Sequence, residues 1–234
     1  SKANKKKINI ISYSRINKKA DIRFLKLKKI KKKYEIKVKI YSKICSFKLN
    51  NDLKFYIDNI LATIAVVSYF TNIKNLKKNI FQNYKIPQGR GNFFKTKFNN
   101  SILNIFDESY NSNPLSLNFA INKFNDFKTN SKKFLLLGDM LELGKYSIKL
   151  HKDAANIINK SNISKVYVYG NYIKNTFNNI KKQKKGRILK SRNDLKIFFK
   201  KEIKDKSYLM IKGSNATGLN LITKQLKLGK INAL

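Results

Sequence analysis

Hydrophobic and polar positions follow one pattern in the first hundred residues of the chain and another in the rest. In the first part, four short stretches are rich in β-branched and aromatic residues and partly alternate, which predicts strands. They are Lys7–Ser12, Asp21–Lys28, Tyr34–Ile40 and Lys43–Leu49. A helix of about 18 residues is expected from Leu53; it is apolar on most faces and should therefore be buried.

Between this helix and residue 106, the pattern predicts a shorter amphipathic helix and two more strands. The helix is expected over Ile73–Phe81, and the strands over Asn92–Phe98 and Ser101–Phe106. The segment Pro87–Gly91 interrupts the pattern, as expected of a turn.

Beyond residue 106, short apolar strands alternate with amphipathic helices. Asn113 and Pro114 predict a helix start, since they suit the N-cap and the first helical position. The other expected elements are strands Lys133–Leu137, Lys165–Tyr169, Arg187–Leu189 and Ser207–Ile211, and helices Ser147–Asn159, Asn171–Ile180, one from Asp194, and Leu219–Leu228. This alternation predicts an α/β fold with a parallel, Rossmann-like sheet and right-handed crossovers. We expect a domain boundary near residue 106.

Charge and composition change this picture little. The 234 residues include 52 Lys and Arg against 13 Asp and Glu, giving a net charge of +39. A nucleic-acid-binding surface is one interpretation. The other, which we favour, is an AT-rich codon bias, because Lys is scattered along the chain, only five of the basic residues are Arg, and no docking motif occurs.

The rare Cys and His residues limit the chemistry. Cys45 has no partner for an internal disulfide, which suits a reducing cytoplasm. One Cys and one His cannot form a metal-binding cluster, so we expect no metal site of that kind. The apolar stretch Phe55–Phe70 is too short to span a membrane. The first residues lack the apolar core of a signal peptide and an initiator Met, which indicates a fragment or a processed product.

Scarce residue types gather at the ends of the expected strands. Gly, Pro and acidic residues are few, yet several fall in the segments 87–91, 107–114, 138–144 and 212–214. Ligands of parallel sheets bind beyond the carboxyl ends of the strands. The loops after Phe106, Leu137, Tyr169 and Ile211 are therefore the expected functional loops.

These segments carry a resemblance to a known family. Asp107–Pro114 reads DESYNSNP and is similar to a D-[DE]-[ST]-Y-N-x-N-P signature, and Gly138–Gly144 reads GDMLELG, with His151 seven residues later. Lys212-Gly213-Ser214 resembles a KGS motif, Gly89-Arg90-Gly91 a GR(G) turn, and Asn59–Ala62 an N-x-L-A helix. Together, in this order and spacing, they resemble the MurF-type Mur ligases of peptidoglycan synthesis.

The resemblance implies both a fold and an activity. It implies that residues 1–106 form the last part of a central ATP-binding domain, and that residues 107–234 form a Rossmann-like C-terminal domain. Ligases of this type are cytoplasmic and use ATP with Mg²⁺ to phosphorylate a carboxylate of UDP-N-acetylmuramoyl-tripeptide. The amine of D-alanyl-D-alanine then attacks the acyl phosphate, and a peptide bond forms.

For the nucleotide, the resemblance implies three contacts in this chain. Arg90 corresponds to an Arg that contacts the ATP phosphates, a role that suits its planar guanidinium; the alternative is a turn residue in solvent. Asp107 corresponds to an Asp that binds the ribose, and the alternative is a helix cap. Asn59 corresponds to an Asn near the adenine, and a buried structural amide is an equal alternative.

For the other substrates and the chemistry, the resemblance implies six residues. Lys212 is the candidate catalytic residue, since it could reach the new phosphate or a substrate carboxylate. The candidate substrate-binding residues are Asn111, Asn113, Asp139, Glu142 and Ser214. Asn113 is also explained as a helix cap, and Asp139 and Glu142 as charges at a helix N-terminus. We interpret His151 as a packing residue of its helix.

The sequence also departs from the family pattern. A G-x-x-G-K-[ST] phosphate loop is absent, and the acidic Mg²⁺ ligand and the UDP-holding domain are expected in an N-terminal part that this chain lacks. Asn215 stands where the family often has Arg. We expect the chain alone to be inactive, and a missing N-terminal half is a possible partner. An inactive binding remnant and a split-gene half remain alternatives.

Overall fold

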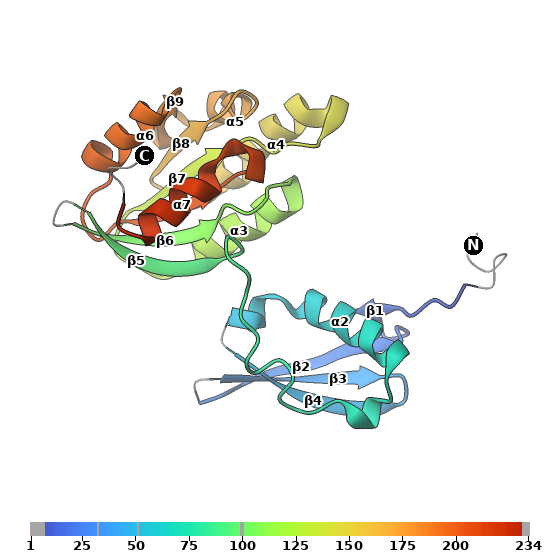
Figure 1. Ribbon diagram of the computed structural model, residues 1–234. Helices are drawn as coiled ribbons and strands as arrows, with labels where there is room; N and C mark the ends of the chain where they lie inside the picture. The colour runs from blue at the N-terminus through green and yellow to red at the C-terminus, as the bar shows by residue number, and fades with distance from the viewer. Residues whose placement is uncertain (1–7, 32, 51, 99–100, 231–234) are drawn as a thin grey trace. The chain divides into compact units, whose positions relative to one another are not determined.

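The computed structural model describes residues 8–31, 33–50, 52–98 and 101–230. The chain folds as two compact units, Ser1–Ile86 and Pro87–Leu234, each with its own sheet (Figure 1). Over the described residues, no helix combines the length and apolarity needed to cross a bilayer.

The sheet of the first unit has four strands in the order β1-β2-β3-β4. The strands are β1 (Tyr13–Ser14), β2 (Ile22–Ile30), β3 (Lys33–Ile40) and β4 (Lys43–Leu49). β1 runs parallel to β2, while β2, β3 and β4 form antiparallel pairs. The expected strands over Asp21–Lys28, Tyr34–Ile40 and Lys43–Leu49 are therefore confirmed.

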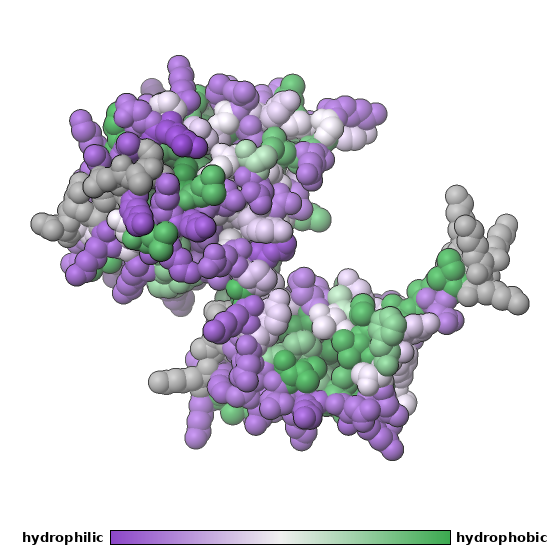
Figure 2. All heavy atoms as spheres, in the orientation of Figure 1, coloured by the Kyte–Doolittle hydropathy of each residue, from purple (hydrophilic) through white to green (hydrophobic). Residues whose placement is uncertain are grey.

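The helix α2 (Ile57–Phe70) covers one face of this sheet, after a 3-10 turn η1 (Asp52–Phe55). Ile60, Leu61 and Ile64 pack with the inward-facing strand residues in one buried cluster. The opposite side of α2 is exposed, since Phe70 is 78% accessible, and Figure 2 shows hydrophobic surface on this unit. The expectation that the helix is buried on most faces is therefore only half right.

Two expected elements of this unit are wrong. Within the expected strand Lys7–Ser12, residues 8–12 form no strand, and Lys7 lies outside the described residues. Ser12 instead binds the carboxylate of Asp21 through its backbone N and its Oγ, at 2.8 and 2.6 Å. The expected helix Ile73–Phe81 is reduced to the single 3-10 turn η2 (Ile73–Asn75), where the side chain of Asn72 accepts from the backbone N of Lys74. Asn side chains compete for backbone groups in this way and disfavour longer helices.

The second unit contains a six-stranded sheet in the order β5-β6-β10-β7-β8-β9. The strands are β5 (Asn92–Phe98), β6 (Ser101–Glu108), β7 (Lys133–Gly138), β8 (Lys165–Tyr169), β9 (Lys185–Leu189) and β10 (Tyr208–Lys212). β5 and β6 form an antiparallel hairpin, and all other neighbours are parallel. This confirms the expected Rossmann-like α/β fold.

Helices cover both faces of this sheet (Figure 1). α3 (Pro114–Asp126), α4 (Ser147–Lys160) and the short α5 (Lys174–Asn179) pack on one face, against Leu135, Leu137 and Val168. α6 (Arg192–Ile197), the π-helical turn η5 (Phe198–Glu202) and α7 (Leu219–Lys227) pack on the other, against Leu136. Strands buried on both faces are near-continuous hydrophobic runs, as in β7.

The domain boundary expected near residue 106 is wrong. β6 pairs with β10 from Asn104 to Glu108, so the hairpin β5–β6 belongs to the second unit. The chain passes between the units at residues 86 and 87. The sequence signal at residue 106 marks the end of one strand of the sheet and not the start of a domain.

Two buried lysines donate hydrogen bonds to backbone carbonyls at the C-terminal ends of helices in this unit. The ammonium of Lys133 donates to the carbonyls of Phe124 and Asn125 at the end of α3, each at 2.8 Å. The ammonium of Lys184 donates to the carbonyls of Ser161 and Ile163 just after α4, at 2.7 and 2.9 Å. These carbonyls lack partners within a helix, so the two lysines satisfy them.

Candidate functional site

Three loops meet at the carboxyl ends of β6, β7 and β10, in the middle of the six-stranded sheet. They span residues 107–114, 138–144 and 212–218, and they carry most of the candidate residues. The side chain of Ser214 joins them: its Oγ accepts from the backbone N of Leu141 at 2.9 Å and donates to the carbonyl of Ser112 at 3.3 Å. The strand-end loops predicted from the sequence are therefore brought together.

Lys212 is the last residue of β10, and it is only 2% exposed. Its ammonium donates to the carbonyl of Asn111 at 2.8 Å, so it ties β10 to the loop after β6. Burial lowers the pKa of Lys212, an effect that the carboxylate of Glu108 opposes and the guanidinium of Arg90 reinforces. Lys212 is thus a positive charge held in a poorly solvated position at the carboxyl end of the central strand β10.

Glu108 is a neighbour of this lysine that was not among the candidate site residues. It ends β6 and lies opposite Lys212 in the parallel register. Burial raises the pKa of Glu108; the charges of Lys212, Lys123 and Arg90 work against that rise, and Asp107 adds to it. The signal available from the sequence was its position beside Asp107 at a strand end, in a chain that has few acidic residues.

Asp107 is 9% exposed and shapes the loop that follows β6. Its Oδ1 accepts from the backbone N of Ser109 at 3.1 Å and from the Ser109 hydroxyl at 2.5 Å. That hydroxyl also lies 3.0 Å from the hydroxyl of Thr223 on α7. Asp107 therefore forms a local turn of the Asx type and does not cap α3, so the cap alternative is wrong.

Arg90 lies on a turn that docks against the same loop. The carbonyl of Gly89 accepts from the backbone N of Tyr110 at 3.1 Å, and the guanidinium of Arg90 lies 4.4 Å from the centre of the Tyr110 ring. Gly89 has a φ of +75°, and a Cβ there would approach the backbone N of Tyr110 to 2.8 Å. Only glycine fits this position without displacing Tyr110, so the turn holds the exposed Arg90 at the edge of the site.

Asp139 is buried, and its side chain accepts hydrogen bonds from the loop that follows β8. Its Oδ2 accepts from the backbone N of Asn171 at 3.0 Å, and its Oδ1 from that of Ile173 at 2.7 Å. Its carbonyl accepts from the backbone N of Ser214 at 2.9 Å. Asp139 therefore stabilises the backbone before α5, which delays the expected helix Asn171–Ile180 until Lys174. Asp139 therefore places its negative charge at the N-terminus of α5, and not at that of α4, which follows Asp139 in the sequence.

Two further candidates on these loops differ in exposure. Glu142 is exposed and has a φ of +63°, which is strained for a residue with a side chain. Asn113 caps α3: its Oδ1 accepts from the backbone N of Ser116 at 2.8 Å, and the Ser116 hydroxyl accepts from the backbone N of Asn113 at 3.0 Å. The predicted N-cap is confirmed.

The side chain of His151, on α4, forms a hydrogen bond with the loop 138–144. Its Nε2 accepts from the backbone N of Met140 at 3.0 Å, and its Nδ1 lies 2.7 Å from the carbonyl of Ser147. Because Nε2 accepts and Nδ1 must donate, this geometry fits the neutral tautomer protonated on Nδ1. His151 is fully buried, so its interpretation as a packing residue agrees with the structure.

Asn59, the remaining candidate, belongs to the first unit. It lies on the first turn of α2 with an exposed side chain, so the alternative of a buried amide is wrong. Its carbonyl accepts from the hydroxyl of Thr63 at 2.8 Å. No group of three or more His, Cys, Asp or Glu side chains that could hold a metal occurs in the described part of the chain.

Comparisons with known proteins match this region of the chain. The family model described as the glutamate ligase domain of Mur ligases matches residues 89–215, which is more than half of the chain. The UDP-N-acetylmuramoyl-tripeptide–D-alanyl-D-alanine ligase of Bacillus subtilis is 32% identical over 117 residues, which are 50% of this chain and 25% of that protein. The ligase of the same name from Buchnera aphidicola subsp. Acyrthosiphon pisum is 32% identical over 129 residues, 52% of this chain and 26% of its own.

Solved structures share the fold of the whole chain. A MurF ligase from Thermotoga maritima in complex with ADP overlays 100% of this chain and 52% of its own length, with a TM-score of 0.69 and 18% identity. A ligase from Acinetobacter baumannii overlays 95% of this chain and 47% of its own, with a TM-score of 0.70 and 17% identity. This chain spans about half the length of these solved relatives, and its matched part spans about a quarter of the curated ones. The chain therefore belongs to the Mur ligase family, and the curated relatives that it resembles are UDP-N-acetylmuramoyl-tripeptide–D-alanyl-D-alanine ligases.

Proposed function

We propose that this chain is the C-terminal part of an ATP-dependent ligase that joins D-alanyl-D-alanine to UDP-N-acetylmuramoyl-tripeptide during peptidoglycan synthesis in the cytoplasm. The observation that carries the proposal is the pair of cations that contact the loop after β6, where the ammonium of Lys212 donates to the carbonyl of Asn111 and the guanidinium of Arg90 lies over the ring of Tyr110. The relatives' names and the shared fold support the same reaction class.

The residues around this loop fit a nucleotide polyphosphate. Arg90 offers a planar, exposed guanidinium fixed over Tyr110, and such a fork suits phosphate oxygens. Asp107 sits beside it on the next loop, where its carboxylate could accept from a ribose hydroxyl. When bound, ATP supplies the phosphoryl group that activates the tripeptide carboxylate. Asn59 on α2 is proposed to lie near the adenine.

Lys212 is proposed to act on the transferred group. Its bond to the carbonyl of Asn111 uses one of three N–H donors on the ammonium. A buried ammonium stabilises a nearby anion more strongly than an exposed one, because little water screens it. The side chain would therefore stabilise negative charge that develops on phosphoryl or carboxylate oxygens.

The remaining candidates take supporting roles in the proposal. Ser214 holds the three loops together, and Asn111 presents the carbonyl that orients Lys212. Glu142 is the exposed acid of the loop 138–144 and is proposed to face a substrate, whereas Asn113 serves α3 as its cap. The principal Mg²⁺ ligands are proposed to come from the part of the ligase that this chain does not include.

The test begins with the DNA immediately upstream of the coding region. An open frame that encodes G-x-x-G-K-[ST] would give a longer polypeptide, which is then assayed for ATP-dependent ligation of D-alanyl-D-alanine to UDP-N-acetylmuramoyl-tripeptide. We expect activity that falls at least a hundredfold with Arg90→Ala or Lys212→Met, and that is unchanged with Lys149→Gln on the exposed side of α4. A frame interrupted by stops, or activity that is insensitive to Arg90→Ala, would contradict the proposal.

A further inference from the structure

The sheet of the first unit has one face that α2 does not cover, and this outer sheet face carries a cluster of cations. The helix packs on the other face, against the inward-facing residues of β2, β3 and β4 (Figure 1). Residues directly opposite each other in antiparallel strands share a face, and β2 shifts its register by a bulge between Phe24 and Lys26. The rows of outward-facing residues across the three strands are therefore Arg23 with Lys39 and Ile44, Lys26 with Lys37 and Ser46, and Lys28 with Glu35 and Lys48.

Most of the positive charge on the outer sheet face is open to solvent. Six of the nine side chains in these rows are Lys or Arg, and Glu35 is the only acidic one. Arg23 and Lys39 are half-buried, and the guanidinium of Arg23 donates to the carbonyl of Lys18 at 2.8 Å. The exposed cations are Lys26, Lys28, Lys37 and Lys48. The face therefore presents a solvated array of positive charge.

The charges in this array repel one another. Arg23 stands opposite Lys39, and Lys26 stands opposite Lys37. Like charges in directly opposite positions destabilise a sheet. Rows of this kind are about 7 Å apart and neighbouring strands about 5 Å apart, so the six cations share one small area. An anion bound to this area would relieve the repulsion.

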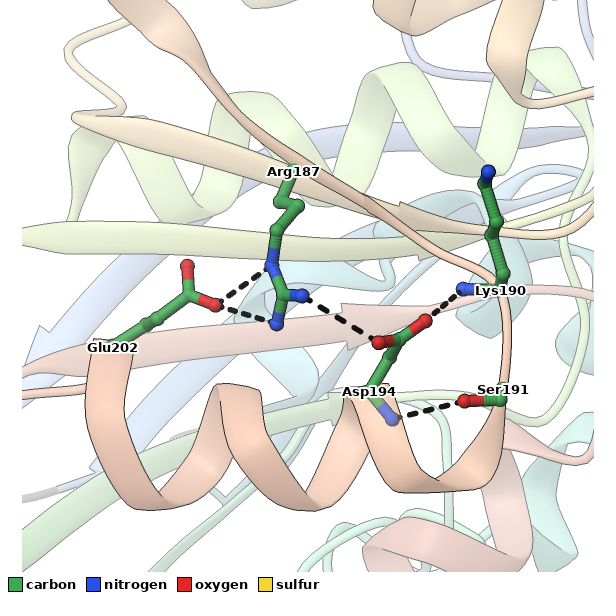
Figure 3. A network of polar contacts seen from close by, with 5 residues as sticks. All are labelled: Arg187, Lys190, Ser191, Asp194 and Glu202. Atoms are coloured by element: carbon green, nitrogen blue, oxygen red, sulfur yellow. Dashed lines mark hydrogen bonds and ion pairs between the residues drawn. The ribbon is translucent and has the colours of Figure 1, made fainter.

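A comparable cation of the second unit is neutralised by acidic side chains. Arg187 lies between Asp194 and Glu202, at 3.5 and 2.7 Å from their carboxylates (Figure 3). The outer sheet face offers only Glu35 to its six cations. The partner that this face fits is therefore an external one with many negative charges.

Apolar side chains on the same face indicate which kind of anionic partner it fits. Ile44 is 67% exposed in the row of Arg23, and Ile30, which stands opposite Lys33 in the row beyond Lys28, is 44% exposed. Sheets that bind single-stranded nucleic acids stack the bases on aromatic side chains, and the three rows contain none. The interfacial region of a bilayer, in contrast, accommodates cations and apolar side chains together.

From this arrangement we propose that the outer sheet face binds the surface of a bilayer that contains anionic lipids. The ammonium groups contact lipid phosphates, while the lysine stems and Ile44 lie against the headgroup region. Membrane binding of this kind lies beyond the proposed ligase reaction and does not depend on it.

The test is co-sedimentation of the 234-residue chain with lipid vesicles at about 150 mM salt. Vesicles of phosphatidylcholine are compared with vesicles in which about 30% of the lipid is phosphatidylglycerol. We expect at least tenfold stronger binding to the anionic vesicles. A lysine near such a surface adds about fivefold in affinity, so the triple variant Lys26→Gln, Lys37→Gln, Lys48→Gln should lose at least twentyfold.

The control of equal charge removes three exposed lysines from α4, with the substitutions Lys149→Gln, Lys152→Gln and Lys160→Gln. It leaves the outer sheet face intact and should lose less than about threefold in affinity. The sheet variant relieves repulsion between opposite lysines, so its stability in urea should be no lower than that of the original chain. This measurement separates a loss of binding from a loss of folding.

A second pair of variants tests the apolar contact. Ile44→Thr keeps a β-branched residue in β4 and should weaken binding to the anionic vesicles at least threefold. Val66→Thr, on the exposed side of α2 in the same unit, is its control and should bind as the original chain does.

The inference is overturned by equal binding to the two kinds of vesicle, or by equal losses in the sheet variant and the α4 control, which would show a general effect of charge. It is also overturned if Ile44→Thr has no effect, because the face would then attract anions by charge alone. Duplex DNA serves as the competitor. Displacement of the chain from the vesicles by an equal concentration of DNA phosphate, with DNA binding lost in the sheet variant, would assign the face to a nucleic acid instead.

Discussion

Lys212 stands directly opposite Glu108 where β10 and β6 end, so two opposite charges share a partly buried edge of the sheet. Each lies where burial disfavours its own charge, and each charge partly offsets the penalty on the other. Such a buried pair adds little to the free energy of unfolding, but it places one positive and one negative charge at defined positions.

The first prediction concerns Glu108→Gln. Burial raises the pKa of Glu108 above its ordinary value of 4.5, so the folded chain favours the protonated carboxyl more than the unfolded chain does. Its contribution to stability is therefore complete below about pH 4.5 and is lost as the pH rises through the higher folded value. Measured as the difference in free energy of unfolding between the two proteins, Glu108→Gln should gain relative to the original chain between pH 4 and pH 7.

That difference cancels the other carboxylates and the general effect of the positive charge, which both proteins share. A constant difference across this pH range would show that Glu108 titrates in the folded chain as it does in the unfolded one. Asp126→Asn, which alters an exposed carboxyl on α3, is the control.

The second prediction compares two glycines that both have positive φ. Gly89→Ala should destabilise the second unit by about 3 kcal/mol, because the new methyl group meets the backbone of Tyr110 as well as the strained φ. Gly144→Ala has a φ of +53° but nothing within 4 Å of the new Cβ, so it should cost only about 1–2 kcal/mol. Urea unfolding followed by circular dichroism measures both, and equal losses would refute the close contact at Gly89.

The third prediction concerns His151→Phe, which keeps an aromatic ring but removes both ring nitrogens. The backbone N of Met140 loses its acceptor, and an unpaired buried N–H costs about 1–3 kcal/mol. Hydrogen exchange of the Met140 amide should accelerate strongly, while Lys152→Gln on the exposed side of the same helix should leave it unchanged. An unaltered exchange rate would mean that the loop 138–144 does not depend on His151.

The fourth prediction is that the 234-residue chain alone releases no phosphate from ATP above background. It contains no G-x-x-G-K-[ST] loop to hold the phosphates. Phosphate release that is abolished by Arg90→Ala would contradict this, and it would show that the sheet edge is sufficient for the chemistry.

The fifth prediction concerns the charge of +39. If the lysines are a general surface feature, binding to duplex DNA should be weak at 50 mM salt and absent at about 200 mM. Fluorescence anisotropy with two unrelated duplexes measures this. Tight binding that survives at the higher salt would support the alternative of a nucleic-acid-binding protein.

In the elements that the sequence predicted correctly, all the local sequence signals favour the same secondary structure. β7 is buried on both faces and reads as an unbroken apolar run, and α3 has a cap, a proline and an apolar face that agree. The segment 73–81 shows the opposite case: its apolar spacing suits a helix, but the side chain of Asn72 just before it accepts from the backbone N of Lys74, and only one 3-10 turn forms.

The meeting of the three strand-end loops was predictable from the sequence, but the contacts within them were not. Scarce residues at strand ends located the three loops, because backbone geometry there tolerates few replacements. The partner of each polar group depends on the strand order, which puts β10 between β6 and β7 although it comes last in sequence. Without that order, neither the register of Glu108 with Lys212 nor the bond from Leu141 to Ser214 could be inferred.

The lysines that bind the carbonyls at the ends of α3 and α4 limit which lysines can be replaced to lower the surface charge. In the described part of the chain, only Lys133, Lys184 and Lys212 are buried, and each donates to backbone carbonyls. Amine-directed acetylation should therefore label the other described lysines first, and an acetylation footprint would separate the three buried lysines from the more accessible ones. A variant stripped of most surface lysines, but retaining these three, would carry the same architecture on a far less cationic protein.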